Sequence, residues 1–309
     1  MAPALNSYRP TVGPVAANFA CFSAMAMWSF VFPVSQILLE TWGAVSLTLI
    51  RQFFAVSTLL MLWFILEGWT VLKSAKWLKG MWVGGYGFGL GAVLLVVGQK
   101  MSDAVTPAIV VAMMPIIGTI IEILLDGRRL KAHLVVGILF ALSGGLIATG
   151  VDLSGGEFGE GAMFCLVAVI LFALGTRSTT REFANLSSLG QTTITLTGAM
   201  LFLTVTFLFW KLTGLKGAEI GNSDQYHLGM LIGVAILSLA FAQFLWIKGA
   251  GVLGIMLASF HMNAVPFYVM VIVVLFLDQD WNASQAIGAL LVAIGVIVSQ
   301  WFGDSARSS

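Results

Sequence analysis

Charged residues are scarce in this sequence. They make up 9% of its 309 residues, while hydrophobic residues make up 59% and the mean hydropathy is +0.99. A water-soluble domain carries roughly 25% charged residues to cover its surface. The composition is therefore typical of an integral membrane protein. The net charge of +1 and the absence of basic tracts also argue against nucleic acid as a partner.

Cysteine and histidine are also rare, with two and three copies. Cys21 and Cys165 both lie in apolar stretches, where we do not expect a structural disulfide. The histidines are dispersed, and the sequence contains neither an HExxH nor a G-x-S-x-G motif. These absences disfavour an intramembrane enzyme, and we predict no catalytic residues, no metal and no cofactor.

The sequence instead contains a series of long apolar stretches. A helix needs roughly 20 apolar residues to cross about 30 Å of hydrocarbon. Ten stretches qualify, and the linkers between them leave no room for a soluble domain. We predict an all-α membrane protein with ten transmembrane helices at 15–37, 44–66, 80–98, 104–125, 132–150, 160–178, 189–210, 228–247, 251–277 and 283–302.

Basic residues are unevenly divided between the two ends of these helices. Because lysine and arginine are retained on the cytoplasmic side, the richer side is predicted to be cytoplasmic. That side carries both termini. We expect a multi-pass protein of a bacterial inner (plasma) membrane, with both termini in the cytoplasm. The richer set is Arg9, Lys73, Lys76, Lys79, Arg128, Arg129, Lys131, Arg177, Arg181, Lys248 and Arg307, and the poorer set is Lys100, Lys211 and Lys216.

Proline and glycine positions indicate an internal duplication. Pro115 and Pro266 are 151 residues apart, and the same offset aligns two glycine pairs in the fifth and tenth predicted spans. Two repeats of five spans each, 1–150 and 151–309, would have opposite orientations in the membrane because five is odd. We therefore predict two inverted five-helix repeats around a central cavity, a design that supports alternating access.

Three segments resemble the drug/metabolite transporter superfamily, whose members carry paired EamA-type repeats. Residues 27–33 read MWSFVFP, similar to the family's Trp-Gly-x-x-Phe pattern but with Ser29 in place of glycine. Residues 51–55 read RQFFA, like its Arg-Phe-x-x-Ala. Span four carries Pro115, a late acidic residue and then DGRRL at 126–130, which departs from the family's Gly-Glu-Arg-Leu turn.

Within that superfamily the chain looks most similar to the YddG-type exporters of aromatic and other neutral amino acids. The resemblance implies a secondary transporter with a cavity lined by spans one, three, four, six, eight and nine. It also implies that an amino acid and the lipid bilayer are the partners; the sequence does not specify an oligomeric state. Export of another small solute, a channel and an intramembrane enzyme are the alternatives.

Polar side chains in hydrocarbon turn toward the bundle interior or a wet cavity, because burial without partners is unfavourable. Span one places Asn18, Met25 and Ser29 on one helical stripe, which could bind a substrate or only bond neighbouring helices. Trp28, near mid-membrane, could stack on a ligand or fill the core. The predicted substrate-binding residues are Asn18, Met25, Trp28, Ser29, Trp82, Tyr86, Gln243, Ser259, His261 and Asn263.

Spans three and eight supply three of these residues. Trp82 and Tyr86 share one face of span three, although Trp82 could equally belong to the interfacial aromatic belt. Gln243 could orient a ligand amine or carboxylate, or bond a neighbouring helix. The glycine-rich sequence of span three predicts close helix approach and not a nucleotide site, since no GK[ST] follows it.

The prolines of spans four and nine are predicted hinges, because proline removes a backbone donor and bends a helix. Ser259 and Asn263 share a face with Pro266, whereas His261 lies on the opposite side of an ideal helix and is a second candidate. A predicted hinge at Pro115 is its counterpart in the first repeat.

Two charged residues lie inside the spans. Arg51 could meet a substrate carboxylate, but snorkelling or packing against carbonyls is the favoured interpretation because span two lies outside the implied cavity. Glu122 lies near the cytoplasmic end of span four, where an ion pair with the nearby Arg128 and Arg129 is favoured over a role in proton coupling.

Overall fold

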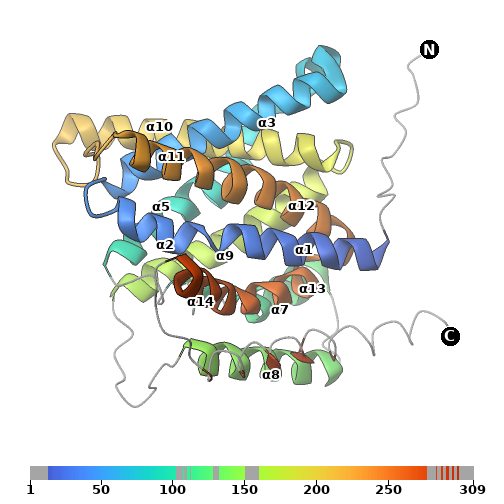
Figure 1. Ribbon diagram of the computed structural model, residues 1–309. Helices are drawn as coiled ribbons and strands as arrows, with labels where there is room; N and C mark the ends of the chain where they lie inside the picture. The colour runs from blue at the N-terminus through green and yellow to red at the C-terminus, as the bar shows by residue number, and fades with distance from the viewer. Residues whose placement is uncertain are drawn as a thin grey trace, which may run out of the picture.

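The computed structural model is all-helical over its described residues, which are 13–101, 113–127, 132–149 and 160–276, with isolated positions at 107–111 and 283–298. The helices lie side by side in one bundle (Figure 1). Within this part of the chain, seven helical segments are long and apolar enough to cross a membrane. Seven of the predicted spans are therefore confirmed, whereas most of the tenth, 283–302, lies outside the described residues.

The helices of the first half, in chain order, are α1 (Pro14–Trp28), α2 (Val31–Leu38), α3 (Ala44–Ser74), α4 (Trp77–Gly84), η1 (Gly85–Leu90), α5 (Gly91–Lys100), α7 (Met114–Asp126) and α8 (Ala132–Thr149). Those of the second half are α9 (Glu160–Glu182), α10 (Ser188–Thr213), α11 (Gln225–Val234), η3 (Ala235–Phe241), α12 (Ala242–Leu253), α13 (Ile255–Ser259), η4 (Phe260–Ala264) and α14 (Val265–Phe276).

The first predicted span, 15–37, is found as one apolar segment over Pro14–Leu38, and a turn at residues 29 and 30 interrupts its helix. Pro33 has no N–H to donate to the carbonyl of Ser29, and its ring would collide with that carbonyl in a regular helix. The Ser29 hydroxyl also donates to the Met25 carbonyl at 2.7 Å. These local effects separate α1 from α2, and the turn lies within the depth of the bundle (Figure 1).

Spans three and eight each contain a short π-helix, η1 and η3 respectively. In span three this segment belongs to the glycine-rich sequence, and the glycines allow close approach as predicted. A Cβ on Gly87 would lie 2.6 Å from the Cα of Gly175 on α9. A Cβ on Gly84 would overlap the carbonyl oxygen of Thr195 on α10. Span three is therefore held at backbone contact by two neighbouring helices.

Span nine is a broken segment composed of α13, the 3-10 helix η4 and α14. It begins after Gly254, whose φ of 81° ends α12 at Leu253. Span nine is found over Ile255–Phe276, a few residues after the predicted start at 251. The start lies later because α12 continues past residue 251 until a glycine, which is free to adopt positive φ, ends it. Gly68, with φ 80°, similarly kinks α3 near the predicted end of span two.

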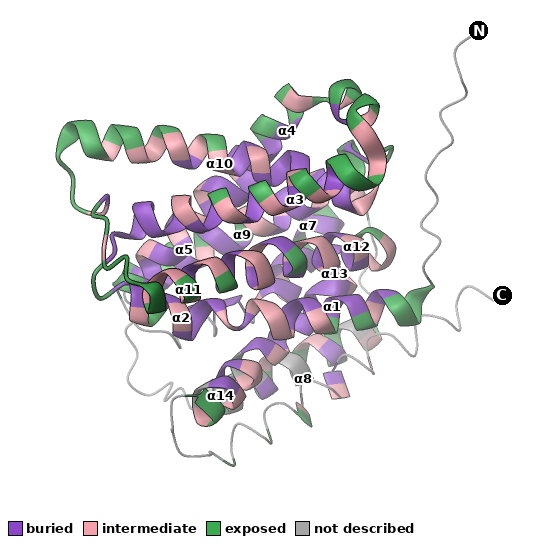
Figure 2. Cartoon of the chain, turned by 45° about the horizontal axis from the view of Figure 1, so that its top comes forward, coloured by how far each residue is buried: buried purple, intermediate pink, exposed green. Residues whose placement is uncertain are grey.

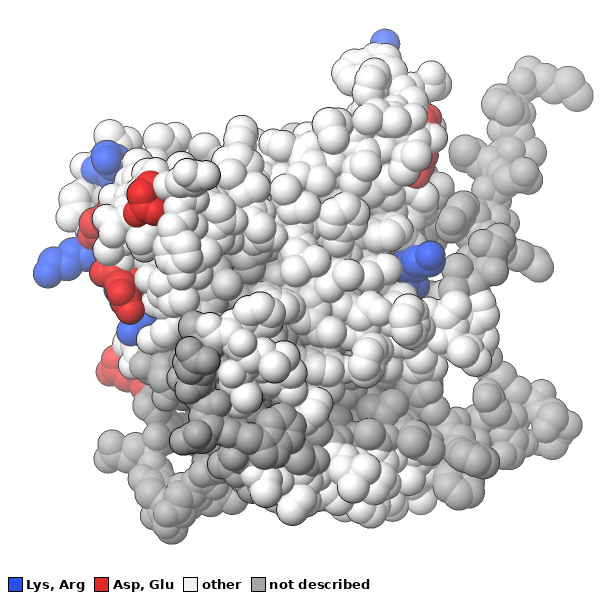
Figure 3. Space-filling view, viewed as in Figure 1, with Lys and Arg blue, Asp and Glu red and all other residues white. Residues whose placement is uncertain are grey.

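The outer surface of the bundle is apolar. Figure 2 shows exposed positions along the outside of the helices, and they include many large apolar side chains such as Phe19, Leu78 and Val205. On the face drawn in Figure 3, charged side chains gather at the ends of the bundle and leave the middle uncharged. Lipid is the solvent that suits such a band.

The loop before α11 packs against the start of α3. The Trp42 indole donates to the Asn222 carbonyl at 3.1 Å, and the Gly43 amide donates to the Glu219 carbonyl at 2.9 Å. The Glu219 carboxylate accepts from the Gly217 amide, and this backbone hydrogen bond lowers the pKa of the Glu219 carboxyl below its ordinary value. These contacts connect the two halves of the chain at this end.

Candidate functional site

A cavity of about 90 Å³ lies at the centre of the bundle. All six spans that the family resemblance implies contribute to its wall, and spans two and seven contribute as well. The lining residues are Met25, Trp28, Val31, Arg51, Gln52, Phe88, Ala92, Leu95, Val96, Gln99, Val111, Met114, Val169, Phe172, Thr176, Leu196, Leu239, Ala242, Gln243, Trp246 and Met262.

Most of this wall is apolar. Four aromatic rings and three methionine side chains line it together with aliphatic residues. Rings give large, rigid contact areas, and methionine adapts to ligand shapes. Polar groups are few, which is the usual composition of a pocket that holds an apolar body and orients it through a small number of hydrogen bonds.

One group of polar residues lies where the wall meets α2. The Arg51 guanidinium donates through Nη1 to the Ser35 hydroxyl at 2.5 Å, and Gln99 Nε2 donates to the Phe32 carbonyl at 3.1 Å. Phe32 and Ser35 are one helical turn apart on α2, so the two contacts bring the side chains of spans two and three to the same short helix. Gln52 follows Arg51 in the sequence and donates to the Leu196 carbonyl at 3.0 Å.

A second polar group lies between α9 and α12. The Trp246 indole donates to the Thr176 hydroxyl at 3.0 Å. Gln243, one helical turn earlier on α12, has a buried Nε2 with no hydrogen-bond partner in the described structure. An unpartnered buried amide is unfavourable, and a bound ligand or water would satisfy it.

Three of the residues predicted to bind substrate line this cavity, namely Met25, Trp28 and Gln243. Trp28 also packs edge-on against Phe32, with 5.1 Å between the ring centroids. Their placement in one wall is compatible with the predicted binding role, which stays a prediction.

The remaining predicted residues of spans one and three lie outside the cavity wall. Asn18 donates to the Pro14 carbonyl at 2.9 Å, and Ser29 is bonded within its own helix. Trp82 is 73% exposed, the position expected of a belt residue. Tyr86 donates to the Ser178 hydroxyl at 2.8 Å and so links η1 to α9.

The span-nine candidates are buried near the cavity but do not line it. Ser259 donates to the Met256 carbonyl at 2.7 Å, and His261 Nδ1 lies 3.1 Å from the Ala258 carbonyl oxygen. Asn263 is 1% exposed, and neither of its side-chain polar atoms has a partner among the described residues. A buried carboxamide without partners is unfavourable, and a ligand or water could satisfy it.

The predicted hinge prolines occupy equivalent places in their helices. Pro115 is the second residue of α7, and Pro266 is the second residue of α14. A first-turn proline breaks no intrahelical bond, because the amides of that turn have no acceptor within the helix. Each proline thus lies at the start of a new helix in the middle of its span. A turn precedes α7, and the 3-10 helix η4 precedes α14.

Several cavity residues were not predicted from the sequence. Arg51 is 2% exposed and contributes to the cavity wall, so it does not snorkel to the membrane surface. Gln52 and Gln99 are polar residues inside apolar spans, and that signal could have identified them. Phe88 and Trp246 carried no comparable signal, because aromatic residues in a membrane helix also face lipid or the core.

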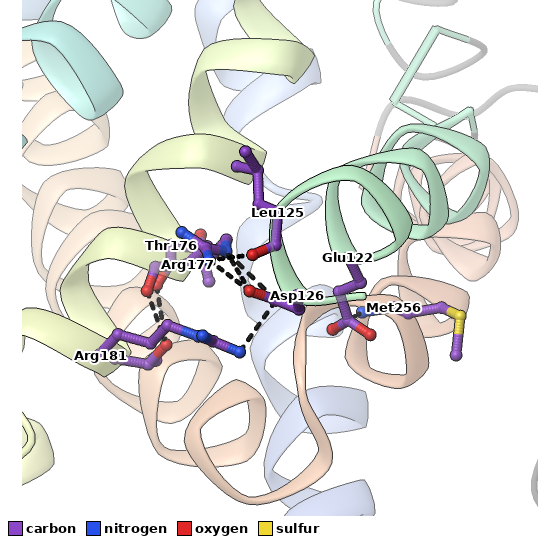
Figure 4. A network of polar contacts seen from close by, with 8 residues as sticks. Glu122, Leu125, Asp126, Thr176, Arg177, Arg181 and Met256 are labelled. Atoms are coloured by element: carbon purple, nitrogen blue, oxygen red, sulfur yellow. Dashed lines mark hydrogen bonds and ion pairs between the residues drawn. The ribbon is translucent and has the colours of Figure 1, made fainter. Parts of the chain in front are cut away.

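A network of charged residues links the two halves at the far ends of α7 and α9 (Figure 4). Arg177 Nε donates to both carboxylate oxygens of Asp126 at 3.1 and 3.2 Å, and Arg181 lies 2.9 Å from the same carboxylate. The carboxylate of Glu122, one turn earlier on α7, accepts from the Met256 amide at 3.0 Å. The C-terminal end of α7 is thus attached to α9 and α13.

The described residues contain no group of three or more histidine, cysteine, aspartate or glutamate side chains placed to hold a metal ion. The wall of the cavity likewise brings together no nucleophile with a base. The groups that the described wall offers are aromatic rings, carboxamides, one hydroxyl and one cation.

Comparisons with known proteins agree with this geometry. A family described as the EamA-like transporter family matches residues 15–150 and again 159–301. A crystal structure of a protein with 16% sequence identity superposes with a TM-score of 0.76, covering 94% of this chain and 99% of the other, which supports the fold alone. No curated protein matches the sequence.

Proposed function

As the chain belongs to the EamA-like transporter family, we propose that it exports neutral amino acids, aromatic ones included, from the cytoplasm of a bacterial cell. Membership makes it a multi-pass membrane transporter of small solutes with two EamA repeats. The observation that carries the narrower proposal is the cavity wall, which combines aromatic rings with three carboxamides and one cation. An amino acid has a matching division between a polar α-carbon end and an apolar side chain.

The proposed architecture is ten helices in two inverted repeats, and helix pairing supports it. α1 of span one packs along α12 of span eight, and α5 of span three packs along α9 of span six. A two-fold axis that exchanges the halves converts one pair into the other. The α3–α10 pair joins spans two and seven, and the α7–α13 pair joins spans four and nine. Exchanging the two halves converts each of these pairs into itself.

Helix irregularities recur at the same repeat positions. The π-helices of spans three and eight, Gly85–Leu90 and Ala235–Phe241, correspond at the offset that aligns the two prolines. The same offset aligns the starts of α7 at Met114 and α14 at Val265. Two independent distortions at one register favour duplication over chance similarity.

We propose that the two halves expose the cavity to each side of the membrane in turn, with the helix starts at Pro115 and Pro266 as hinges. Asp126 belongs to the first half, and Arg177 and Arg181 belong to the second, so their ion pairs must separate if the halves part at this end. Lys79, Lys248 and these arginines lie at the ends predicted to be cytoplasmic. The ion-pair network is therefore the proposed cytoplasmic gate.

A substrate panel in proteoliposomes, with and without a pH gradient, tests the proposed function. We expect saturable transport of neutral amino acids, with phenylalanine, leucine and similar side chains preferred because the cavity wall is apolar. Empty liposomes and liposomes that contain the Gln243→Trp variant, whose larger ring would fill the cavity, are the controls. Transport of a nucleotide sugar or an amine, with no amino acid moved, would contradict the amino-acid assignment and leave the family membership intact.

A further inference from the structure

We propose that Arg51 is the substrate's carboxylate site, so that this transporter selects solutes that carry a carboxylate group. The inference rests on the proposed function and specifies how the cavity holds an amino acid. Its starting observation is that Arg51 is the single charged side chain in the wall formed by the described residues.

The guanidinium of Arg51 has no counter-ion in the described part of the chain. Its hydrogen-bond partner is neutral, the hydroxyl of Ser35, and no described carboxylate lies within ion-pair distance of it. A buried charge without an opposite charge is strongly unfavourable in hydrocarbon. An anionic ligand in the adjacent cavity would supply the missing charge during the transport cycle.

The geometry of the guanidinium suits a carboxylate. Ser35 occupies Nη1, and buried Nε has no hydrogen-bond partner. No described residue accepts a hydrogen bond from Nη2 either. Nε and Nη2 form the side edge of the guanidinium, which presents two parallel N–H groups to the two oxygens of a carboxylate. The edge needed for bidentate binding is therefore the edge that the protein leaves unused.

Acceptors for an ammonium group lie in the same wall. Gln52 and Gln99 each donate through Nε2 to a backbone carbonyl. The Oε1 atom of each carboxamide is not used in that hydrogen bond. No described donor bonds either Oε1 atom. A ligand with a carboxylate on Arg51 could thus place an adjacent ammonium among carboxamide oxygens and its side chain against the rings.

Structural roles for Arg51 predict a different outcome. An arginine that only anchors α2 through Ser35 would affect folding and leave the preference among ligands unchanged. Replacing a binding arginine would change affinity for carboxylates and leave affinity for their analogues without a carboxylate unchanged. The ligand series, and not the activity of a variant alone, separates the two roles.

The experiment measures binding of L-phenylalanine, 3-phenylpropionate and L-phenylalaninamide to the purified protein and to Arg51→Gln, Arg51→Lys and Lys211→Gln. We expect the wild type to bind the two carboxylates, phenylalanine and 3-phenylpropionate, more tightly than the amide. Arg51→Gln should lower phenylalanine affinity by roughly 10- to 150-fold, the range for a lost charged hydrogen bond, and leave amide affinity within about 3-fold. Arg51→Lys should restore part of the loss. Lys211→Gln, which removes an exposed charge at the end of α10, should match the wild type.

The outcomes separate this inference from the proposed function. If the wild type binds phenylalanine and its amide equally, or Arg51→Gln keeps the carboxylate preference, the Arg51 assignment is overturned while amino-acid export stands. If the wild type binds and moves no amino acid, the proposed function fails first. Should Arg51→Gln not fold, the wild-type ligand series and Arg51→Lys still decide the question.

Discussion

Replacing Gly84 with alanine is expected to destabilise the folded protein by roughly 3 kcal/mol or more, at the upper end of overpacking effects. The new Cβ would overlap the Thr195 carbonyl oxygen and lie 2.7 Å from its carbon and 2.9 Å from the Ala199 amide nitrogen. All of these are backbone atoms of α10, so no side-chain rotation relieves the overlap. Thermal unfolding in detergent should show a large fall in melting temperature or no folded protein.

Gly233→Ala is the matched control. Gly233 lies in α11, and a Cβ added there meets no atom within 4 Å. Alanine is the better helix former, so we expect this variant to be unchanged or slightly more stable, within about 1 kcal/mol. Equal melting temperatures for the two variants would show that spans three and seven do not approach at Gly84.

Replacing Asp126 with asparagine is expected to lower the export rate about 10- to 100-fold, on the order of the effect of losing one charged hydrogen bond. Asp126 accepts from Arg177 and Arg181 across the two halves, and its side chain is only 11% exposed. Without its charge the closed cytoplasmic gate loses its main attraction, so the conformational equilibrium shifts toward the state open to the cytoplasm. Amide exchange at the C-terminal turns of α7 and α9 should rise in parallel.

Two further variants make this prediction specific. If Asp126 and Arg177 act as a pair, the Asp126→Asn/Arg177→Gln double variant should be no worse than the poorer single variant. Glu182→Gln removes an ion pair with Lys79 at the same end, but both side chains are about half exposed. Exposed pairs contribute little, so that variant should export at the wild-type rate. A wild-type export rate for Asp126→Asn would contradict the proposed role of the ion pairs as a cytoplasmic gate.

The parts of the fold that the sequence predicts best are those set by length and hydropathy. The apolar stretches locate seven spans, and the glycines of span three predict its backbone contacts. The irregularities that length and hydropathy do not predict occur where local chemistry interrupts a helix. Ser29 and Pro33 break span one, and Gly254 delays the start of span nine. Windowed hydropathy does not detect these interruptions, because they depend on the missing N–H of a proline and on the backbone freedom of a glycine.

The residues that line the cavity are harder to predict, for a physical reason. A helical serine or asparagine can satisfy itself on a carbonyl three or four residues earlier, as Asn18, Ser29 and Ser259 do. Such residues need no cavity, although a helical stripe makes them look like lining residues. Gln243 and Arg51 differ because long side chains reach beyond their own helix. That reach, and not polarity alone, distinguishes the residues that contribute to the cavity wall.

Arg51 also shows the limit of reasoning from the family resemblance. The resemblance leaves span two out of the cavity, and it therefore favours snorkelling or packing against carbonyls over substrate binding for this arginine. The contact of spans two and seven through α3 and α10 instead brings the start of span two to the wall. Helix packing decides which residues face the cavity, and no single-span pattern contains that information.

Counterflow of labelled phenylalanine is the measurement that tests the central claim most directly. Proteoliposomes loaded with unlabelled phenylalanine are diluted into trace labelled phenylalanine, with no other gradient present. A carrier that exposes one central site alternately to each side should accumulate the label transiently above its external concentration, and the rate should saturate. Passive equilibration of the label without accumulation, at a rate proportional to concentration, would contradict alternating access.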